Sequence, residues 1–345
     1  MRLALFSTKP YDRTYFEAAK AARGQDGVEL IFHEVSLTDD TAPLSQGAEA
    51  VCVFVNDCLS SAVVEKLARY GVKAILLRCA GYNNVHLETA EKHGIAVANV
   101  PSYSPEAVAE FAVALVQTLN RNTHRAYNRV REGNFALDGL LGHTLHGRTV
   151  GIVGTGKIGL ATARIMKGFG CRVLASDPFP SRALEDVGTY ASLDELLPQC
   201  DIISLHCPLT DSTRHIINEH TIGKMKRGVM LVNTSRGGLI DTKAVIQALK
   251  KGQLGGLALD VYEGEGSLFY DDHSGEIIHD DVLMRLTTFH NVLVCGHQAF
   301  FTAEALTEIA DCTFRNAEEL SQTGTCQNML TKGVLKRDAL PVRSV

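Results

Sequence analysis

The chain has 345 residues, and its 34 Lys and Arg stand against 39 Asp and Glu, so the formal net charge is −5 at pH 7 with neutral histidine. Hydrophobic residues make up 45% and charged residues 21% of the chain, which excludes a disordered or collagen-like protein. Nucleic acid is not an expected partner of a mildly acidic chain, because phosphate backbones attract basic surfaces. The length favours two domains, since a domain typically has about 100–200 residues.

Short apolar segments rich in β-branched residues alternate with helical patterns, which predicts an α/β fold with parallel sheets. No apolar segment approaches the ~18 residues of a membrane-spanning helix, and residues 3–6 are too few for the core of a signal peptide. We therefore expect no membrane partner. In the first part of the chain, strands are expected at residues 3–6, 30–35, 50–55, 74–77 and 96–99, with helices at 61–70 and 87–93.

A further helix is expected to begin at Ser104, which can cap free N–H groups, with Pro105 and Glu106 in its first turn. Its apolar residues recur every three or four positions, and its other faces are apolar too. A helix of this kind must be buried on more than one side. That burial lies either between domains or between subunits, and the hypothesis is a homo-oligomer, either a homodimer or a homotetramer.

The second half predicts another α/β series, with strands at residues 149–153, 172–176, 201–206, 229–233, 257–260 and 291–294. Residues 263–281 are polar and predict a long loop, residues 303–320 predict a terminal helix, and a loose tail is expected from about residue 331. The nine cysteines are scattered and form no C-x-x-C pair, so we expect reduced thiols in a cytoplasmic protein. No metal-ligand spacing such as H-E-x-x-H is present, and no metal is expected.

A glycine-rich turn predicts dinucleotide binding. Gly154, Gly156 and Gly159 have the G-x-G-x-x-G spacing directly after a predicted strand and directly before a helix. Such glycines allow a tight turn, close approach to a pyrophosphate and close packing of helix and strand. The next predicted strand ends at Asp177, where a carboxylate can accept hydrogen bonds from both ribose hydroxyls and repel a 2′-phosphate. The cofactor is therefore expected to be NAD rather than NADP, with Lys157 and Ile158 beside the pyrophosphate.

The chain resembles the D-isomer-specific 2-hydroxyacid dehydrogenases, which combine such a turn with a downstream Arg, Glu and His. The matching segments are VNTSRG at 232–237, DVYEGE at 260–265 and GHQAF at 296–300. Within the family, the chain is most similar to fermentative D-lactate dehydrogenases in FVNDCLS at 54–60, LRCAGYNNV at 77–85, VPSYSPEAVAEF at 100–111, ISLHCPLT at 203–210 and DVYEGEGSLFYDD at 260–272. The resemblance covers residues 1–328.

The resemblance implies two Rossmann-like or flavodoxin-like lobes with parallel sheets and the active site in the cleft between them. Residues 1–100 and 300–345 would form a discontinuous substrate-binding (catalytic) domain. Residues 101–299 would form the NAD-binding Rossmann domain. The implied reaction is the reversible reduction of pyruvate to D-lactate by NADH.

The resemblance also implies three catalytic residues, and their chemistry suits the reaction. Arg236 can bind the substrate carboxylate through its planar, permanently charged fork. His297 can act as general acid in reduction and as general base in oxidation. Glu265 can hydrogen-bond the other ring nitrogen of His297 and favour the charged imidazolium.

Further site residues are implied by position in the family. The additional cofactor contacts would be Cys207, Pro208, Thr234, Ser235 and Asp260. The substrate would be contacted by Arg78, Ala80, Gly81, Tyr103 and Phe300, together with Arg236 and His297. For Arg78, Ala80 and Gly81 the expected donors are backbone N–H groups.

Two alternatives stay open at this point. Another 2-hydroxyacid dehydrogenase, acting on hydroxypyruvate, glyoxylate or a larger 2-keto acid, needs the same three residues, and one extra methylene changes binding by only ~1–3 kcal/mol. An NADH-sensing interaction protein of the same fold would bind the cofactor as a switch. Turnover of NADH with pyruvate separates these two classes.

Overall fold

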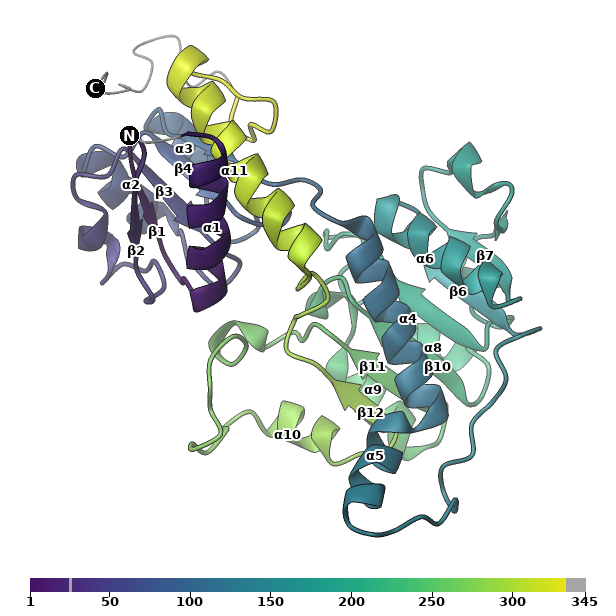
Figure 1. The fold of residues 1–345 in the computed structure, drawn as a ribbon. Coiled ribbons are helices and arrows are strands. Elements are labelled where there is room, and N and C mark those ends of the chain that lie inside the picture. The colour runs from purple at the N-terminus through teal and green to yellow at the C-terminus, as the bar shows by residue number, and fades with distance from the viewer. Residues whose placement is uncertain (25–26, 333–345) are drawn as a thin grey trace. The chain divides into compact units, whose positions relative to one another are not determined.

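The computed structural model describes residues 1–24 and 27–332 of the chain, so the predicted tail beyond residue 332 lies outside the described residues. The chain divides into two compact units (Figure 1). The first unit comprises Met1–Ser104 and the segment that begins at Phe301, and the second comprises Pro105–Phe300. Each unit contains one sheet in which every strand pair of the described chain is parallel, which confirms the predicted α/β class.

The first unit is built on a five-stranded sheet with the order β2-β1-β3-β4-β5. Its strands are β1 (Arg2–Leu5), β2 (Glu29–Phe32), β3 (Ala50–Val53), β4 (Ala74–Leu77) and β5 (Ala96–Ala98). Its α-helices are α1 (Pro10–Ala22), α2 (Ser61–Arg69), α3 (Leu87–Lys92) and α11 (Ala303–Thr323). Helix α11 returns from the far end of the chain to pack beside α1, where Phe16 and Phe314 meet in the core with ring centroids 5.9 Å apart (Figure 1).

Helix α1 was not predicted, and its inward face explains why. The buried residues of α1 are Asp12, Phe16 and Ala19, so one of the three positions that face the core is acidic. The Asp12 carboxylate accepts a hydrogen bond from Nε of Arg78 at 3.0 Å inside the unit. A buried ion pair therefore interrupts the apolar period by which a helix is recognised in a sequence.

The second unit contains a seven-stranded sheet with the order β12-β11-β10-β9-β6-β7-β8. Its strands are β6 (Thr149–Val153), β7 (Arg172–Ser176), β8 (Thr189–Tyr190), β9 (Ile202–Leu205), β10 (Val229–Asn233), β11 (Leu254–Leu259) and β12 (Val292–Val294). Its α-helices are α4 (Pro105–Arg121), α5 (Thr123–Arg131), α6 (Lys157–Gly168), α7 (Leu193–Leu196), α8 (Glu219–Lys224), α9 (Thr242–Lys250) and α10 (Asp281–Thr287). Strand order reverses beside β6, whose neighbours are β7 and β9, and ligands of open parallel sheets bind at such a point.

The apolar helix α4 is buried within its own unit. It packs against α6 and against β10, β11 and β12 of the sheet. A Cβ on Gly256 of β11 would lie 2.9 Å from Cδ2 of Leu119, so this glycine admits the helix closely. These contacts explain the apolar faces of α4 that pack inside the second unit, and the expected homo-oligomer stays a prediction. No helix among the described residues has the length and apolar character needed to cross a membrane.

Candidate active site

Two glycines of the turn between β6 and α6, Gly154 and Gly159, leave no room for a side chain. Gly154 has φ +94°, and a Cβ there would lie 2.6 Å from the backbone nitrogen of Cys207. A Cβ on Gly159 would lie 1.9 Å from the carbonyl oxygen of Gly154. Gly156 is the N-cap of α6, makes no side-chain cap hydrogen bond, and faces open space where its Cβ would be. The first N–H groups of α6, which follow at Lys157 and Ile158, therefore suit an anionic pyrophosphate.

Asp177 lies beside this turn, at the carboxyl end of β7. One of its carboxylate oxygens accepts hydrogen bonds from the backbone N–H of Thr155 at 2.6 Å and from the Thr155 hydroxyl at 3.1 Å. The other oxygen accepts from the N–H of Phe179 at 2.8 Å. The half-buried carboxylate is thus fixed next to the turn, as a ribose-binding residue requires.

The carboxyl ends of β9 and β10 form the adjoining part of the site. The Ser235 hydroxyl donates to the carbonyl oxygen of Cys207 at 2.6 Å and ties the two strand ends together, with Pro208 exposed beside them. Oγ1 of Thr234 is buried and has no hydrogen-bond partner within the described chain. An unsatisfied buried hydroxyl costs free energy, so this atom fits a polar group supplied by a bound cofactor.

His297 and Glu265 are in direct contact. Nδ1 of His297 lies 2.9 Å from Oε1 of Glu265, and the two side chains are 15% and 22% exposed. The second oxygen of Glu265 accepts from the backbone N–H of Tyr262 at 2.9 Å, which fixes the carboxylate. The remaining ring nitrogen, Nε2, is chemically able to exchange a proton with a bound molecule.

The backbone at His297 is held in an unusual conformation by Asp260. His297 has φ +54°, and its N–H donates to the carbonyl oxygen of Asp260 at 2.7 Å. The two carboxylate oxygens of Asp260 accept from the N–H groups of Gln298 at 2.8 Å and Ala299 at 2.9 Å. Burial raises the pKa of Asp260, and these backbone donors lower it in part. Asp260 is fully buried, so the structure gives it a role in positioning His297 and not the expected contact with the cofactor.

Arg236 follows the carboxyl end of β10, the strand next to β11 in the sheet. Its Nη1 donates to the carbonyl oxygen of Ser235 at 2.7 Å, and Nδ2 of Asn233 donates to the carbonyl oxygen of Arg236 at 2.9 Å. A Cβ on Gly237 would lie 2.1 Å from the carbonyl carbon of Tyr262, so the Arg236 loop touches the segment that leads to Glu265. The three expected catalytic residues therefore follow three neighbouring strands, β10, β11 and β12.

The expected substrate contacts Arg78, Ala80, Gly81 and Tyr103 belong to the first unit. Arg78 is 2% exposed, and its backbone N–H donates to the carbonyl oxygen of Val53 at 3.0 Å. Each nitrogen of its guanidinium also donates, to Asp12 at 3.0 Å and to the carbonyl oxygens of Phe6 at 2.9 Å and Ser7 at 2.8 Å. The expectation that the Arg78 N–H binds substrate is therefore wrong, because these internal partners already engage it.

The other expected substrate residues are placed differently. Ala80 and Gly81 are half-buried in the loop after β4, where Nδ2 of Asn99 donates to the carbonyl oxygen of Ala80 at 2.8 Å. Tyr103 is half-buried at the end of the first unit, and Phe300 is buried at the end of the second.

One neighbour of His297 was not anticipated. The Tyr270 ring lies 5.8 Å from the His297 ring, and its hydroxyl lies 3.4 Å from the carbonyl oxygen of His297. The segment DVYEGEGSLFYDD contains this tyrosine, but no spacing in it shows that the chain turns back toward His297.

Comparisons with known proteins agree with this arrangement. Residues 113–299 match the family "D-isomer specific 2-hydroxyacid dehydrogenase, NAD binding domain". The D-lactate dehydrogenase kk1H of Curvularia clavata is 64% identical over 334 residues, 96% of each chain. The 2-hydroxyacid dehydrogenase A of Aspergillus oryzae is 61% identical over 346 residues, 99% of this chain and 100% of that protein. The apo-structure of D-lactate dehydrogenase from Escherichia coli has a TM-score of 0.87 at 50% identity, covering 96% of this chain and 100% of that one.

These matches confirm the resemblance expected from the sequence. The matched NAD-binding domain spans more than half of the chain and contains the glycine turn, Asp177, Arg236, Glu265 and His297. The chain therefore belongs to the D-isomer specific 2-hydroxyacid dehydrogenases and is an NAD-dependent oxidoreductase.

Proposed function

We propose that this enzyme is a D-lactate dehydrogenase, which reduces pyruvate to D-lactate with NADH and catalyses the reverse reaction with NAD. The observation that carries the proposal is the contact between His297, which follows β12, and Glu265, which follows β11. Strand β11 lies between β12 and β10 in the sheet, and β10 ends just before Arg236. The names of the relatives from Curvularia clavata and Escherichia coli support pyruvate and D-lactate as the substrate pair.

Arg236 is the proposed carboxylate-binding residue. Its guanidinium is charged at every working pH, and its fork matches the two oxygens of a carboxylate. A cation there also stabilises the negative charge that develops on the carbonyl oxygen during reduction. One of its nitrogens donates to the carbonyl oxygen of Ser235, which limits the directions that the guanidinium can take.

His297 is the proposed general acid and base. In reduction the imidazolium gives its Nε2 proton to the carbonyl oxygen, and in oxidation the neutral ring takes the hydroxyl proton of lactate. The Glu265 carboxylate at Nδ1 stabilises the imidazolium and fixes the orientation of the ring. Asp260 acts one step away, because it holds the backbone of residues 297–299.

When bound, NADH supplies the hydride. The proposed roles of the chain are to hold the pyrophosphate at the glycine turn and the ribose at Asp177. The proposed contacts with the rest of the cofactor are Gly154, Gly156, Lys157, Ile158, Gly159, Cys207, Pro208, Thr234 and Ser235. The partnerless hydroxyl of Thr234 supports its place in this set.

The first unit is proposed as the substrate-binding domain and the second as the NAD-binding domain. The half-buried backbone of Ala80 and Gly81 is proposed to contact the substrate carboxylate, and Tyr103 and Phe300 to contact its small side chain. Support for Ala80 comes from the hydrogen bond with Asn99, which fixes the loop without using the N–H group of Ala80.

A homo-oligomer, either a dimer or a tetramer, is proposed as the state in solution. Support comes from residues 127–141 of the second unit, where five large apolar side chains are at least half exposed. They are Tyr127, Val130, Phe135, Leu137 and Leu141. Concentrations of exposed apolar surface mark association sites. A cytoplasmic location is also proposed, and the nine free cysteines support it.

The test is a panel of four 2-keto acids with NADH and with NADPH: pyruvate, hydroxypyruvate, glyoxylate and phenylpyruvate. We expect the highest kcat/KM with pyruvate and NADH, and D-lactate as the product in chiral analysis. A higher kcat/KM with another acid would assign the enzyme to that substrate within the family. Tight NADH binding without turnover of any acid would instead favour the NADH-sensing alternative.

A further inference from the structure

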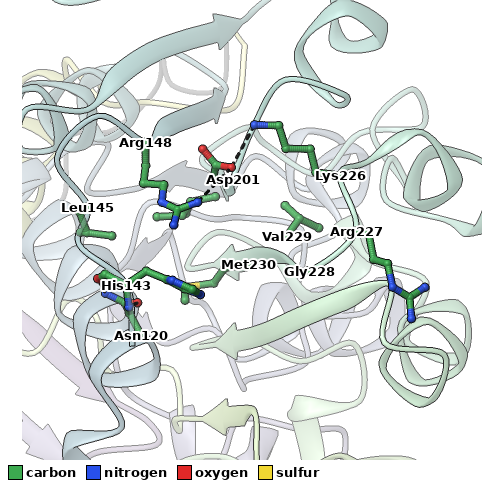
Figure 2. Close-up of a pocket in the computed structure, with 11 residues that line it drawn as sticks. Asn120, His143, Leu145, Arg148, Asp201, Lys226, Arg227, Gly228, Val229 and Met230 are labelled. Atoms are coloured by element: carbon green, nitrogen blue, oxygen red, sulfur yellow. Dashed lines mark hydrogen bonds and ion pairs between the residues drawn. The ribbon is translucent and has the colours of Figure 1, made fainter. Parts of the chain in front are cut away.

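The second unit contains a cavity at the amino ends of its parallel strands, whereas the proposed active site lies at their carboxyl ends. The cavity has a volume of about 230 Å³, and residues at the amino ends of β6, β9 and β10 line it. Figure 2 draws the lining residues as sticks. Arg148, Asp201 and Gly228, which line it, directly precede these three strands. The glycine turn and Arg236 follow the carboxyl ends of β6 and β10, about 16 Å away for a five-residue strand. The cavity is therefore separate from the cofactor and substrate sites proposed above.

Asp201 is the centre of the charged wall of this cavity. Its Oδ2 accepts from the backbone N–H of Thr149 at 2.9 Å, and its Oδ1 lies 3.0 Å from Nζ of Lys226 and 3.8 Å from Nη1 of Arg148. Figure 2 shows the two cations reaching this one carboxylate. Burial raises the pKa of Asp201, but the Thr149 N–H and the Lys226 ammonium outweigh it and hold the pKa below its usual value. Asp201 is therefore ionised at neutral pH.

The cavity wall nevertheless carries a surplus of positive charge. Two basic side chains, Arg148 and Lys226, approach the single carboxylate of Asp201. Arg227 also lines the cavity, but its guanidinium donates to the carbonyl oxygen of Lys251 at 3.1 Å. Lys226 has three N–H donors, and its contact with Asp201 uses one of them. The 3.8 Å approach of Arg148 is an ion pair beyond hydrogen-bond distance. Their side chains are 40% and 43% exposed, so donors remain accessible to a ligand.

The rest of the cavity is a formed surface of apolar and fixed polar groups. Leu145, Ile202 and Met230 provide apolar walls. His143 lines the cavity next to them, and its loop is fixed because Nδ2 of Asn120 donates to the His143 carbonyl oxygen at 2.8 Å while the His143 N–H donates to Asn120 Oδ1 at 3.0 Å. Apolar walls with convergent cations suit a ligand with a short carbon skeleton and an anionic group.

We propose that this cavity binds a small organic dianion, held by charge-assisted hydrogen bonds from Lys226 and Arg148. Phosphate monoesters and dicarboxylates share this chemistry. The ligand is small, because the volume is below the 300–1,000 Å³ that is usual for pockets of drug-sized ligands. The ligand binds together with NADH and does not displace it, because the two sites lie at opposite ends of the strands.

The experiment is isothermal titration calorimetry of the full chain, both free and saturated with NADH, at constant ionic strength. The probes are glycerol 3-phosphate, succinate and inorganic phosphate, with chloride as the control ion. We expect glycerol 3-phosphate or succinate to bind at one site per chain. The probe that binds more tightly shows whether the ligand is a phosphate monoester or a dicarboxylate. K226Q and R148Q should each weaken binding about tenfold or more. K224Q is the matched control, because Lys224 is a nearby cation on α8 that pairs with Asp194 and does not line the cavity, and it should not alter binding.

A second variant, D201N, is expected to change the affinity in the opposite direction. It therefore separates a loss of ligand binding from a general loss of structure. D201N removes the competing carboxylate charge while its amide oxygen can still accept from Thr149, so binding should become tighter. All variants are compared by thermal melting to show that they fold. Absence of binding in the millimolar range, equal binding by K226Q and the wild type, or loss of binding when NADH is added would each overturn the proposal.

Discussion

The strained backbone of His297 is the central feature at the scale of single residues. Its φ of +54° costs a residue with a side chain about 1–2 kcal/mol. Three hydrogen bonds, accepted by the carbonyl and the carboxylate of the buried Asp260, offset that cost. Strain of this kind persists where the surroundings fix it, and here it sets the direction in which the His297 ring leaves the chain.

Replacement of the proposed acid tests the role of His297 directly. H297Q should lower kcat for pyruvate reduction by about 10²–10⁴, because the carbonyl oxygen loses its proton donor. NADH binding, followed by fluorescence titration, should stay within a few-fold of the wild type. H290Q is the control, since His290 is exposed outside the proposed site. A near-normal kcat for H297Q would show that another group donates the proton.

Replacement of Glu265 tests its action on the imidazolium. In E265Q the ring loses a carboxylate 2.9 Å from its Nδ1 that fixes its orientation and stabilises the imidazolium. We expect kcat for pyruvate reduction to fall about tenfold or more, measured in steady state with saturating NADH. The control is E263Q, because Glu263 is a neighbouring carboxylate that pairs with His215 at 2.8 Å instead. An unchanged kcat for E265Q would remove Glu265 from the mechanism.

Cofactor choice is also decided by one residue. D177A removes the charge that repels a 2′-phosphate and the acceptor for the ribose hydroxyls. We expect KM for NADH to rise and KM for NADPH to fall, so that the NADH/NADPH ratio of kcat/KM drops about tenfold or more. Paired steady-state measurements with both cofactors check this. An unchanged ratio would mean that another group discriminates between them.

At the scale of elements, the close approach of two loops joins Arg236 to Glu265. G237A should lower both activity and Tm, because its Cβ would lie 2.1 Å from the backbone of Tyr262 and the overlap typically costs about 1–3 kcal/mol. G223A is the matched control in α8, where a Cβ meets nothing within 4 Å. That change should raise stability by up to ~1 kcal/mol. Normal kcat/KM in G237A would show that the loops can separate without harm.

The same scale shows which elements a sequence reveals. Fully buried strands such as β3, β4 and β6 are continuous apolar segments, and their positions were predicted to within two residues. Helix α1 was missed because Asp12 occupies its buried face, and β8 is only two residues long. Helix α4 was recognised, but its partners were not, because composition shows that a face is buried and not what covers it.

Site residues follow a related rule. Residues whose type is demanded by chemistry or sterics, such as Gly154 and His297, could be located by motif and resemblance. The internal partners of Arg78 and Asp260 could not, because each depends on backbone groups brought together by folding. The sequence therefore predicted that these two charged residues bind a ligand, whereas their hydrogen-bond partners are groups of the protein itself.

At the scale of the whole molecule, the position of exposed apolar surface supports the proposed association with a second copy of the chain. Leu137 and Leu141 are 81% and 91% exposed, although α4, the most apolar helix pattern, is buried within its own unit. Association would cover residues 127–141 and remove this apolar area from water, at about 25 cal/mol per Å².

The corresponding prediction concerns mass in solution. Size-exclusion chromatography with light scattering should give at least twice the chain mass for the wild type, and L137E with L141E should shift the protein toward monomer, because charges would be buried without partners. I277E is the control, since Ile277 is 82% exposed but lies outside residues 127–141. A monomeric wild type would exclude the oligomer. An oligomer that survives L137E with L141E and dissociates in I277E would place the interface around Ile277 instead.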